Sequence, residues 1–279
     1  LIVSYFTLLP NSLIDFVKSV ISSIGFVSNF YFYLSGGEYS AIESLLNPFL
    51  HTWSLSIEEQ YYLVFPLLLF IFYKKLNNKI IICLILLFLI SFLLAIFYSE
   101  TNKSLSFYSF QTRFWELIAG SIISVVRYKK IYKLNNRTIL NYIIYTSFFV
   151  LISSFFLFND KSNHPSLITL LPVLSVCLII LFSNNNQIII KILSSKFFVF
   201  FGLISYSLYL WHYPIFSFYR VYFAGGGFIS YFLDKILIVV LLFSLSIFSY
   251  FVVEKYFRNR VISFSKVIIF LSLNLFFII

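Results

Sequence analysis

The run IIICLILLFLISFLLAIF at residues 80–97 decides the fold class, because its eighteen residues contain no charge. A second run of the same length and character, ILIVVLLFSLSIFSYFVV, lies at residues 236–253. A helix needs about 20 apolar residues to cross roughly 30 Å of hydrocarbon. Helical structure is expected for both runs, since a helix satisfies its own backbone groups in lipid. The two runs therefore predict membrane-spanning helices.

The composition of the whole chain extends this prediction. Of 279 residues, 61% are hydrophobic and 11% are charged, and the mean hydropathy is +0.96. A soluble domain is about a quarter charged, so this chain is interpreted as an integral membrane protein. The fold class predicted is all-α, a polytopic transmembrane helical bundle with about nine spans. Besides the two runs above, spans are expected at 15–34, 55–73, 111–127, 139–158, 166–183, 198–218 and 262–279.

The net charge of +10 is interpreted first as a topology signal. Thirteen Lys and Arg residues fall in one set of alternate loops and five in the other, and basic loops stay in the cytoplasm. The basic set is Lys74, Lys75, Lys79, Arg127, Lys129, Lys130, Lys133, Arg137, Lys191, Lys196, Lys255, Arg258 and Arg260; the opposite set is Lys103, Arg113, Lys161, Arg220 and Lys235. We therefore expect a multi-pass protein of the cytoplasmic (inner) membrane, with the 36–54 loop and the C-terminus outside. Membrane lipid is the expected partner of this charge, and nucleic acid is not.

Ionisable residues are costly inside a membrane, so those near the helices are candidates for function. Most of them collect at the outward ends of three predicted helices, at one depth. They are His51, Trp53, Glu58 and Glu59, then Arg113 and Glu116, then Trp211 and His212. Such a group suits acid/base chemistry, because His titrates near neutrality and a nearby carboxylate can orient it.

Spacing supports shared helix faces. Arg113 and Glu116 are three apart and can pair on a helix surface. Ser205, Tyr209 and His212 follow an i, i+4, i+7 rule and share one stripe, and Pro214 is expected to end or kink that helix. The alternative stays open that the aromatic residues are an interfacial belt and that the Arg/Glu pair is a structural clamp.

Other polar residues receive plainer interpretations. His164 is expected to be a solvated loop residue, and Glu254 to form a helix-end ion pair beside Lys255 and Arg258. Cys83 and Cys177 lie in apolar runs and are expected to serve packing. No His, Cys or Glu grouping has the spacing of a metal site, so no metal is predicted. No G-x-S-x-G motif for a serine nucleophile is present either.

Five stretches together resemble the membrane acyltransferase 3 family, the polysaccharide and lipopolysaccharide O-acetylases. HTWSLSIEEQYYLVFP at 51–66 is similar to the family signature H-x-W-S-L-x-x-E-x-Q-F/Y-Y-L-x-x-P. The other four are SNFYF at 28–32, RFWELIAG at 113–120, SYSLYLWHYP at 205–214 and VEKYFRNR at 253–260. In the last of these Tyr256 stands where the family has Pro.

The resemblance implies transfer of an acyl group, typically acetyl from acetyl-CoA, to a sugar hydroxyl of a cell-surface glycan or a lipid-linked sugar. With the polar groups above, it identifies candidates for catalysis and for substrate binding. The catalytic candidates are His51, Glu58, Glu116 and His212; the binding candidates are Trp53, Ser54, Arg113, Tyr209 and Trp211.

The resemblance also bears on domain organisation. Residues 1–279 are expected to form one integral-membrane acyltransferase domain. The family carries an Arg and a His on a first transmembrane helix, which is expected upstream of Leu1, and some members continue into an extracytoplasmic SGNH-type domain, which is expected downstream. Two other functions stay open: a transporter or flippase, which broken helices in matching halves would favour, and an inactive scaffold, which absence of the upstream His would favour.

Overall fold

The computed structural model describes most of the chain as helix, and no strand occurs in the part that it describes. The described residues are 2–36, 42–76, 79–131, 136–158, 164–183, 187–222 and 232–258. The all-α fold class is therefore confirmed. The chain divides into two compact units. Unit 1 consists of residues 1–20, 42–50 and 196–279, and unit 2 of residues 21–41 and 51–195.

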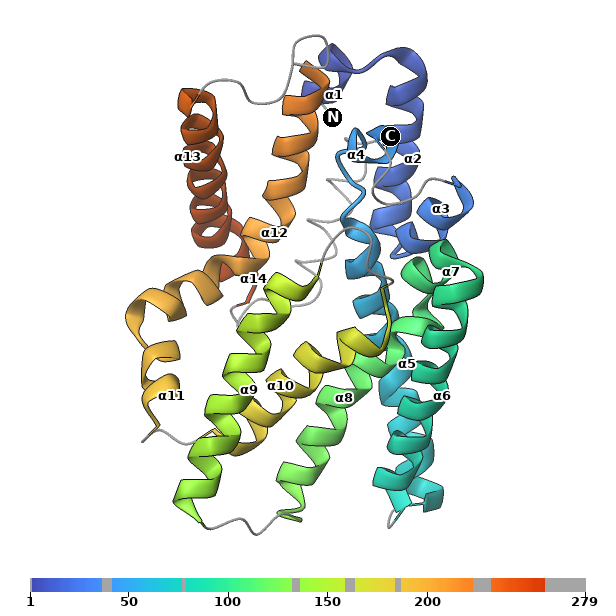
Figure 1. The fold of residues 1–279 in the computed structure, drawn as a ribbon. Coiled ribbons are helices and arrows are strands. Elements are labelled where there is room, and N and C mark those ends of the chain that lie inside the picture. Colours follow the sequence, from blue (N-terminus) through green and yellow to red (C-terminus); the bar gives the residue numbers. More distant parts are fainter. Residues whose placement is uncertain are drawn as a thin grey trace. The chain divides into compact units, whose positions relative to one another are not determined.

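Unit 2 contains the long helices of the first two thirds of the chain (Figure 1). Helix α8 packs against α5, α6 and α10, and α10 in turn packs against α9. The short helices α3 and α7 pack against each other, and they contact α5 and α6 respectively. The elements are α3 (Ser28–Leu34), α5 (Thr52–Leu76), α6 (Ile80–Thr101), α7 (Lys103–Tyr108), α8 (Phe110–Tyr128), α9 (Arg137–Leu157), η2 (Leu167–Thr169), α10 (Leu170–Phe182) and α11 (Ile188–Leu193).

Unit 1 contains residues from both ends of the sequence. Helix α12 packs against α13, against the π-helical turn η3 and against α1. Its elements are α1 (Ile2–Thr7), α2 (Pro10–Ile24, of which the part up to Val20 belongs here), α4 (Ile42–Leu45), α12 (Lys196–Tyr222), α13 (Phe232–Ser249), η3 (Tyr250–Glu254) and α14 (Lys255–Phe257).

Four of the described helical segments are long and apolar enough to cross a membrane. They are Thr52–Lys74, Ile80–Thr101, Arg137–Leu157 and Asp234–Phe257, and the shorter segment Leu167–Phe182 is also apolar. The expected count of nine spans is not confirmed. The helices predicted at 111–127 and 198–218 exist as α8 and α12, but their polar and charged residues keep both outside this group. The predicted span at 262–279 lies outside the described residues.

The predicted span at 15–34 is wrong, because the chain breaks it into α2 and α3. The amide of Val27 donates to the carbonyl of Ser22, and the amide of Phe26 donates to that of Ser23. This pair of bonds is a Schellman motif, which satisfies the last carbonyls of a helix and ends it. Phe26 occupies the left-handed position at φ 55°, which is uncommon for a bulky side chain.

Of the two effects expected of Pro214, a kink stays a prediction, but a helix end is wrong. Helix α12 continues through Pro214 to Tyr222, so Pro214 does not end the helix. Proline inside a helix removes one backbone hydrogen bond, and long membrane helices tolerate this loss.

The first turn of α8 is held against α6 by one buried serine. Ser91 Oγ donates to the carbonyl of Gln111 at 2.5 Å and accepts from the amide of Trp115 at 2.9 Å. The fully buried indole of Trp115 packs edge-on against Phe88 and Phe92 of α6. These contacts fix the helical turn that carries Arg113 and Glu116.

The two ends of unit 2 differ in charge. The end of α5, the start of α6, the end of α8 and the start of α9 lie together at the lower end in Figure 1. They carry the exposed residues Lys74, Lys79, Arg127, Lys129, Lys130 and Arg137. The starts of α5 and α8, with Trp53 and Arg113, lie at the opposite end of their helices. The basic residues and the predicted site thus occupy opposite ends of this unit.

Candidate functional site

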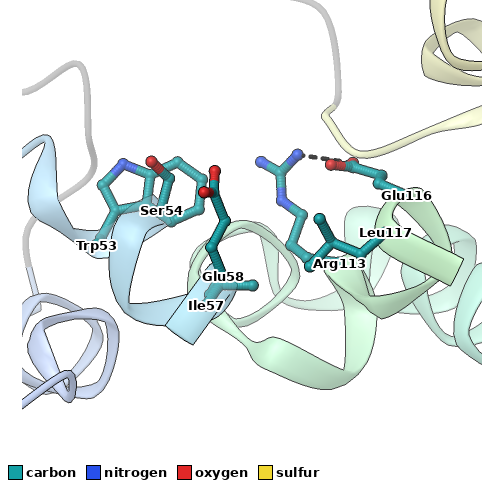
Figure 2. Close-up of a pocket in the computed structure, with 7 residues that line it drawn as sticks. All are labelled: Trp53, Ser54, Ile57, Glu58, Arg113, Glu116 and Leu117. Atoms are coloured by element: carbon teal, nitrogen blue, oxygen red, sulfur yellow. Dashed lines mark hydrogen bonds and ion pairs between the residues drawn. The ribbon is translucent and has the colours of Figure 1, made fainter. Parts of the chain in front are cut away.

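A pocket lies between the first turns of α5 and α8, wholly within unit 2 (Figure 2). Its cavity measures about 80 Å³, enough for a few water molecules or a small acyl group. It is lined by Trp53, Ser54, Ile57, Glu58, Arg113, Glu116 and Leu117. The structure therefore brings together five of the residues that the sequence singled out, and the sequence analysis missed Ile57 and Leu117.

The α5 wall of the pocket is fixed from behind by a chain of hydroxyl groups. Ser28 Oγ lies 2.7 Å from Ser56 Oγ and accepts from Thr52 Oγ1 at 3.1 Å. Thr52 Oγ1 lies 2.6 Å from Ser23 Oγ. Ser28, Thr52 and Ser56 are all buried, so these bonds are shielded from water. They set the position of the α5 turn that carries Trp53 and Glu58.

The stretch SNFYF contributes a second support through Asn29, which is fully buried. Asn29 Nδ2 donates to the carbonyl of Tyr108 at 3.1 Å, and its Oδ1 accepts from Gln60 Nε2 at 2.9 Å. Gln60 also donates to the carbonyl of Phe26. One amide side chain thus ties α3 to both α5 and α7, which gives Ser28 and Asn29 a structural role beside the pocket.

Arg113 is the most constrained charge of the pocket, at 5% exposure. Its Nε donates to the carbonyl of Phe107 at 3.2 Å, and its Nη1 forms an ion pair with Glu116 Oε1 at 2.9 Å. The guanidinium carbon lies 5.2 Å from the ring centre of Trp53 and 5.0 Å from that of Phe107, which is the geometry of a cation–π contact. The expected pairing of Arg113 with Glu116 is confirmed.

The second terminal nitrogen of Arg113 differs from the first. Nη2 is buried and has no hydrogen-bond partner among the described residues. In Figure 2 the guanidinium nitrogen that is not bonded to Glu116 lies on the side of Glu58. An uncommitted, buried cationic donor is costly unless a ligand oxygen satisfies it. It is also the kind of donor that stabilises developing negative charge.

His164 contacts the guanidinium of Arg113, and the sequence did not predict this contact. Its Nε2 is 2.7 Å from Arg113 Nη1, and its ring lies 6.3 Å from both Phe107 and Phe158. Partial burial, and secondarily the positive charge of Arg113, lower the pKa of His164 to about 3. His164 is an exposed loop residue, as expected, but its Nε2 also contacts Arg113 Nη1. A partner 51 positions away leaves no local signal in the sequence.

His51 is buried, at 3% exposure, immediately before α5 begins at Thr52. It does not line the pocket. Its proposed catalytic role remains a prediction.

The third group of predicted residues belongs to unit 1. Tyr209, Trp211 and His212 lie on α12, where His212 Nδ1 is 2.6 Å from the carbonyl of Tyr209 and the two rings are 5.6 Å apart. The expected neighbourhood of Tyr209 and His212 on one helix is confirmed. Their participation in one site with Glu58 and Arg113 of unit 2 stays a prediction.

Glu254 of unit 1 behaves as expected for a helix-end ion pair. Its Oε1 pairs with Arg258 Nη1 at 3.1 Å, and its Oε2 accepts from Ser207 Oγ of α12 at 3.0 Å. Lys255 instead lies over the ring of Phe251. The carboxylate therefore links α12 to the end of the α13 segment. Elsewhere, no cluster of three His, Cys, Asp or Glu side chains with metal-binding geometry occurs in the described part of the chain.

Comparison with known proteins gives a consistent picture. A family model described as "Acyltransferase domain" matches residues 4–278. The O-acetyltransferase OatA of Staphylococcus aureus (strain NCTC 8325) is 29% identical over 257 residues, which are 88% of this chain and 42% of OatA. An uncharacterized protein of Haemophilus influenzae (strain Rd) is 36% identical over 184 residues, 61% of this chain and 73% of that protein. No solved structure gives a significant match. These relationships support an O-acyltransferase, and the chain spans less than half the length of OatA.

Proposed function

Because the chain belongs to the acyltransferase domain family, we propose that it transfers an acyl group, most simply acetyl, from acyl-CoA to a hydroxyl group of a cell-surface polysaccharide or lipopolysaccharide. The similarity to OatA, an O-acetyltransferase, supports the reaction class. The acyl donor and the glycan acceptor belong to the proposal.

The observation that carries this proposal is the free donor of Arg113. Attack on a thioester carbonyl places negative charge on the carbonyl oxygen, and a preorganised buried donor stabilises that charge. Nη2 is buried and without a partner in the described structure, while the rest of the guanidinium is held by Phe107 and Glu116. In this proposal Nη2 binds the acyl carbonyl oxygen.

The transfer also needs a group that accepts the proton of the attacking hydroxyl. A bond forms between the acceptor oxygen and the acyl carbon, the carbon–sulfur bond breaks, and the hydroxyl proton passes through a base to the departing thiolate. Glu58 is the base proposed within the pocket, because it lines the cavity opposite Arg113 and, unlike Glu116, forms no ion pair with it. His51 and His212 remain candidates from the sequence, with Ser54, Tyr209 and Trp211 as candidates for binding the sugar.

The charge distribution of unit 2 supports the expected orientation. Its basic end carries Lys74 and Lys129, and basic residues favour the cytoplasmic side. The pocket then faces outward, where surface glycans lie, in a cytoplasmic membrane with the C-terminus outside. Acyl-CoA is made in the cytoplasm, so the proposal requires a route through the protein by which the thioester reaches the pocket.

The experiment is a transfer assay with the protein expressed from its complete coding sequence. Membrane vesicles receive acetyl-CoA labelled in the acetyl group, and mass spectrometry follows O-acetylation of the isolated surface polysaccharide. We expect label on the glycan with wild-type protein, and a strong loss with Glu58→Gln and with Glu116→Gln. Unchanged labelling in both variants would remove the site assignment, and absence of acyl transfer by the wild type would remove the function.

A further inference from the structure

We propose that His164 is a positioning residue: as a neutral imidazole it accepts a hydrogen bond from Arg113 Nη1 and thereby holds Nη2 in the pocket. The inference deepens the proposed function, and it rests on that function for its effect on the reaction rate.

The protonation state of His164 follows from its partner. A guanidinium has only donors, and His164 Nε2 lies 2.7 Å from Arg113 Nη1. Nε2 must therefore be the acceptor, the ring proton is on Nδ1, and the imidazole is neutral. Phe107 and Phe158 contact the ring edge-on, each at 6.3 Å, and keep its plane in place.

The geometry around Arg113 shows what His164 adds. Nε donates to the carbonyl of Phe107, and the two N–H groups of Nη1 are directed to Glu116 and to His164. Of the five N–H groups of an arginine, these three are engaged, and those of Nη2 have no acceptor among the residues that the structure describes. Without His164, one N–H of Nη1 loses its acceptor, and the guanidinium can turn until Nη2 no longer faces the cavity.

A neutral acceptor suits this position better than a carboxylate. Glu116 already balances the charge of Arg113 in an ion pair. A carboxylate in place of His164 would add a further negative charge beside Glu116 and Glu58, which opposes the oxyanion that Nη2 is proposed to stabilise. An imidazole fixes the guanidinium without adding charge.

Two substitutions separate the acceptor from the bulk of the ring. His164→Gln keeps an acceptor, the amide oxygen, at the reach of Nε2, whereas His164→Phe keeps the packing against Phe107 and Phe158 but removes the acceptor. We expect His164→Gln to stay near wild type. We expect His164→Phe to lower kcat roughly 10- to 100-fold with little change in KM, because a misplaced group weakens the transition state more than substrate binding.

A chemical readout tests the same contact without the reaction. Phenylglyoxal modifies accessible arginines, and peptide mass spectrometry gives the rate for each. Arg113 should react slowly in wild type and in His164→Gln, and several-fold faster in His164→Phe. Arg258, whose side chain is 63% exposed, provides the internal reference and should react equally in all three. Thermal unfolding in detergent checks that each variant is folded.

The outcomes are distinct. Equal Arg113 labelling and equal kcat in all three proteins would overturn the positioning role. A folded His164→Gln as impaired as His164→Phe would overturn the acceptor role in particular. If wild type transfers no acyl group while labelling changes as expected, the proposed function fails and the positioning of Arg113 stands.

Discussion

Two ion pairs, one in each unit, differ in which of the two charged partners is buried. In unit 2 the cation is the buried partner: the side chain of Arg113 is 6% exposed and that of Glu116 is 28% exposed. In unit 1 the anion is buried: Glu254 is 14% exposed, whereas Arg258 is 63% exposed. Both oxygens of Glu254 have partners, one being Ser207, but one nitrogen of Arg113 has none among the described residues.

This difference indicates that Arg113 belongs to a binding site, whereas Glu254 holds two helical segments together. Buried charges are tolerated when every polar atom is satisfied, and Glu254 meets this condition by joining two helical segments. Only part of the Arg113 guanidinium meets this condition, because Nη2 has no partner among the described residues. Arg113 lies beside a cavity. We therefore expect changes at Arg113 to affect chemistry and changes at Glu254 to affect stability.

The largest effect is expected from Arg113→Lys. Lysine keeps the charge but loses the planar fork that contacts Phe107, Glu116 and His164 together. Loss of one oxyanion donor typically lowers the rate about 100- to 1,000-fold, and we expect a decrease of that order in kcat/KM in the transfer assay. The matched control is Arg258→Lys, which makes the same change in the exposed partner of the other pair and should leave kcat/KM within about twofold. Equal losses in both variants would contradict the distinction.

A smaller loss is expected from Glu58→Gln. The amide keeps the size of the side chain but cannot accept the hydroxyl proton, and we expect a loss of about 100-fold, the lower end of what general-base catalysis contributes. The control is Glu59→Gln, the next residue on α5, which does not line the pocket. Initial rates at saturating donor should fall with the first variant and not with the second. Comparable rates for the two variants would mean that Glu58 is not the base. His51 would then be the next candidate for that role.

At the ion pair of Glu254 with Arg258, Ser207→Ala should lower the stability of the protein without lowering its transfer activity. It removes one hydrogen bond to the Glu254 carboxylate and leaves the Arg258 pair intact. Hydrogen bonds between membrane helices are worth about 1 kcal/mol, so we expect a lower unfolding temperature and unchanged activity per folded molecule. Ser205→Ala is the control, because within the described part of the chain Ser205 donates to the carbonyl of Gly202 in its own helix and to no other group. An equal destabilisation by both changes would show that the bond to Glu254 adds nothing.

The sequence predicted the parts of this arrangement that depend on short spacing. Arg113 and Glu116 are three residues apart on one helix, and Glu254 and Arg258 are four apart, so each pair could be predicted from helical geometry. The contact of His164 with Arg113 has no such signal, because it depends on tertiary packing across 51 residues.

The long apolar runs likewise predicted helices correctly, but the predicted continuous span at 15–34 failed. The left-handed conformation of Phe26 ends α2, and hydropathy does not encode it. Gly25 immediately before Phe26 was the available signal of a helix end.

The smallest effect is expected in the pH dependence of stability, where His164 distinguishes the two pairs. In the folded protein its pKa is lowered to about 3, chiefly by burial and then by Arg113, whereas the unfolded chain has the ordinary value of about 6.5. Below that ordinary value the unfolded state binds a proton that the folded state does not, so the stability of wild type falls as pH decreases from 7 towards 4. His164→Gln lacks this titration and should lose less stability over the same range.

The measurement is the difference in unfolding temperature between wild type and His164→Gln, taken at pH 7 and again at pH 5, in one detergent and at one ionic strength. A difference that does not change with pH would mean that His164 is protonated equally in both states, which is incompatible with a neutral acceptor for Arg113.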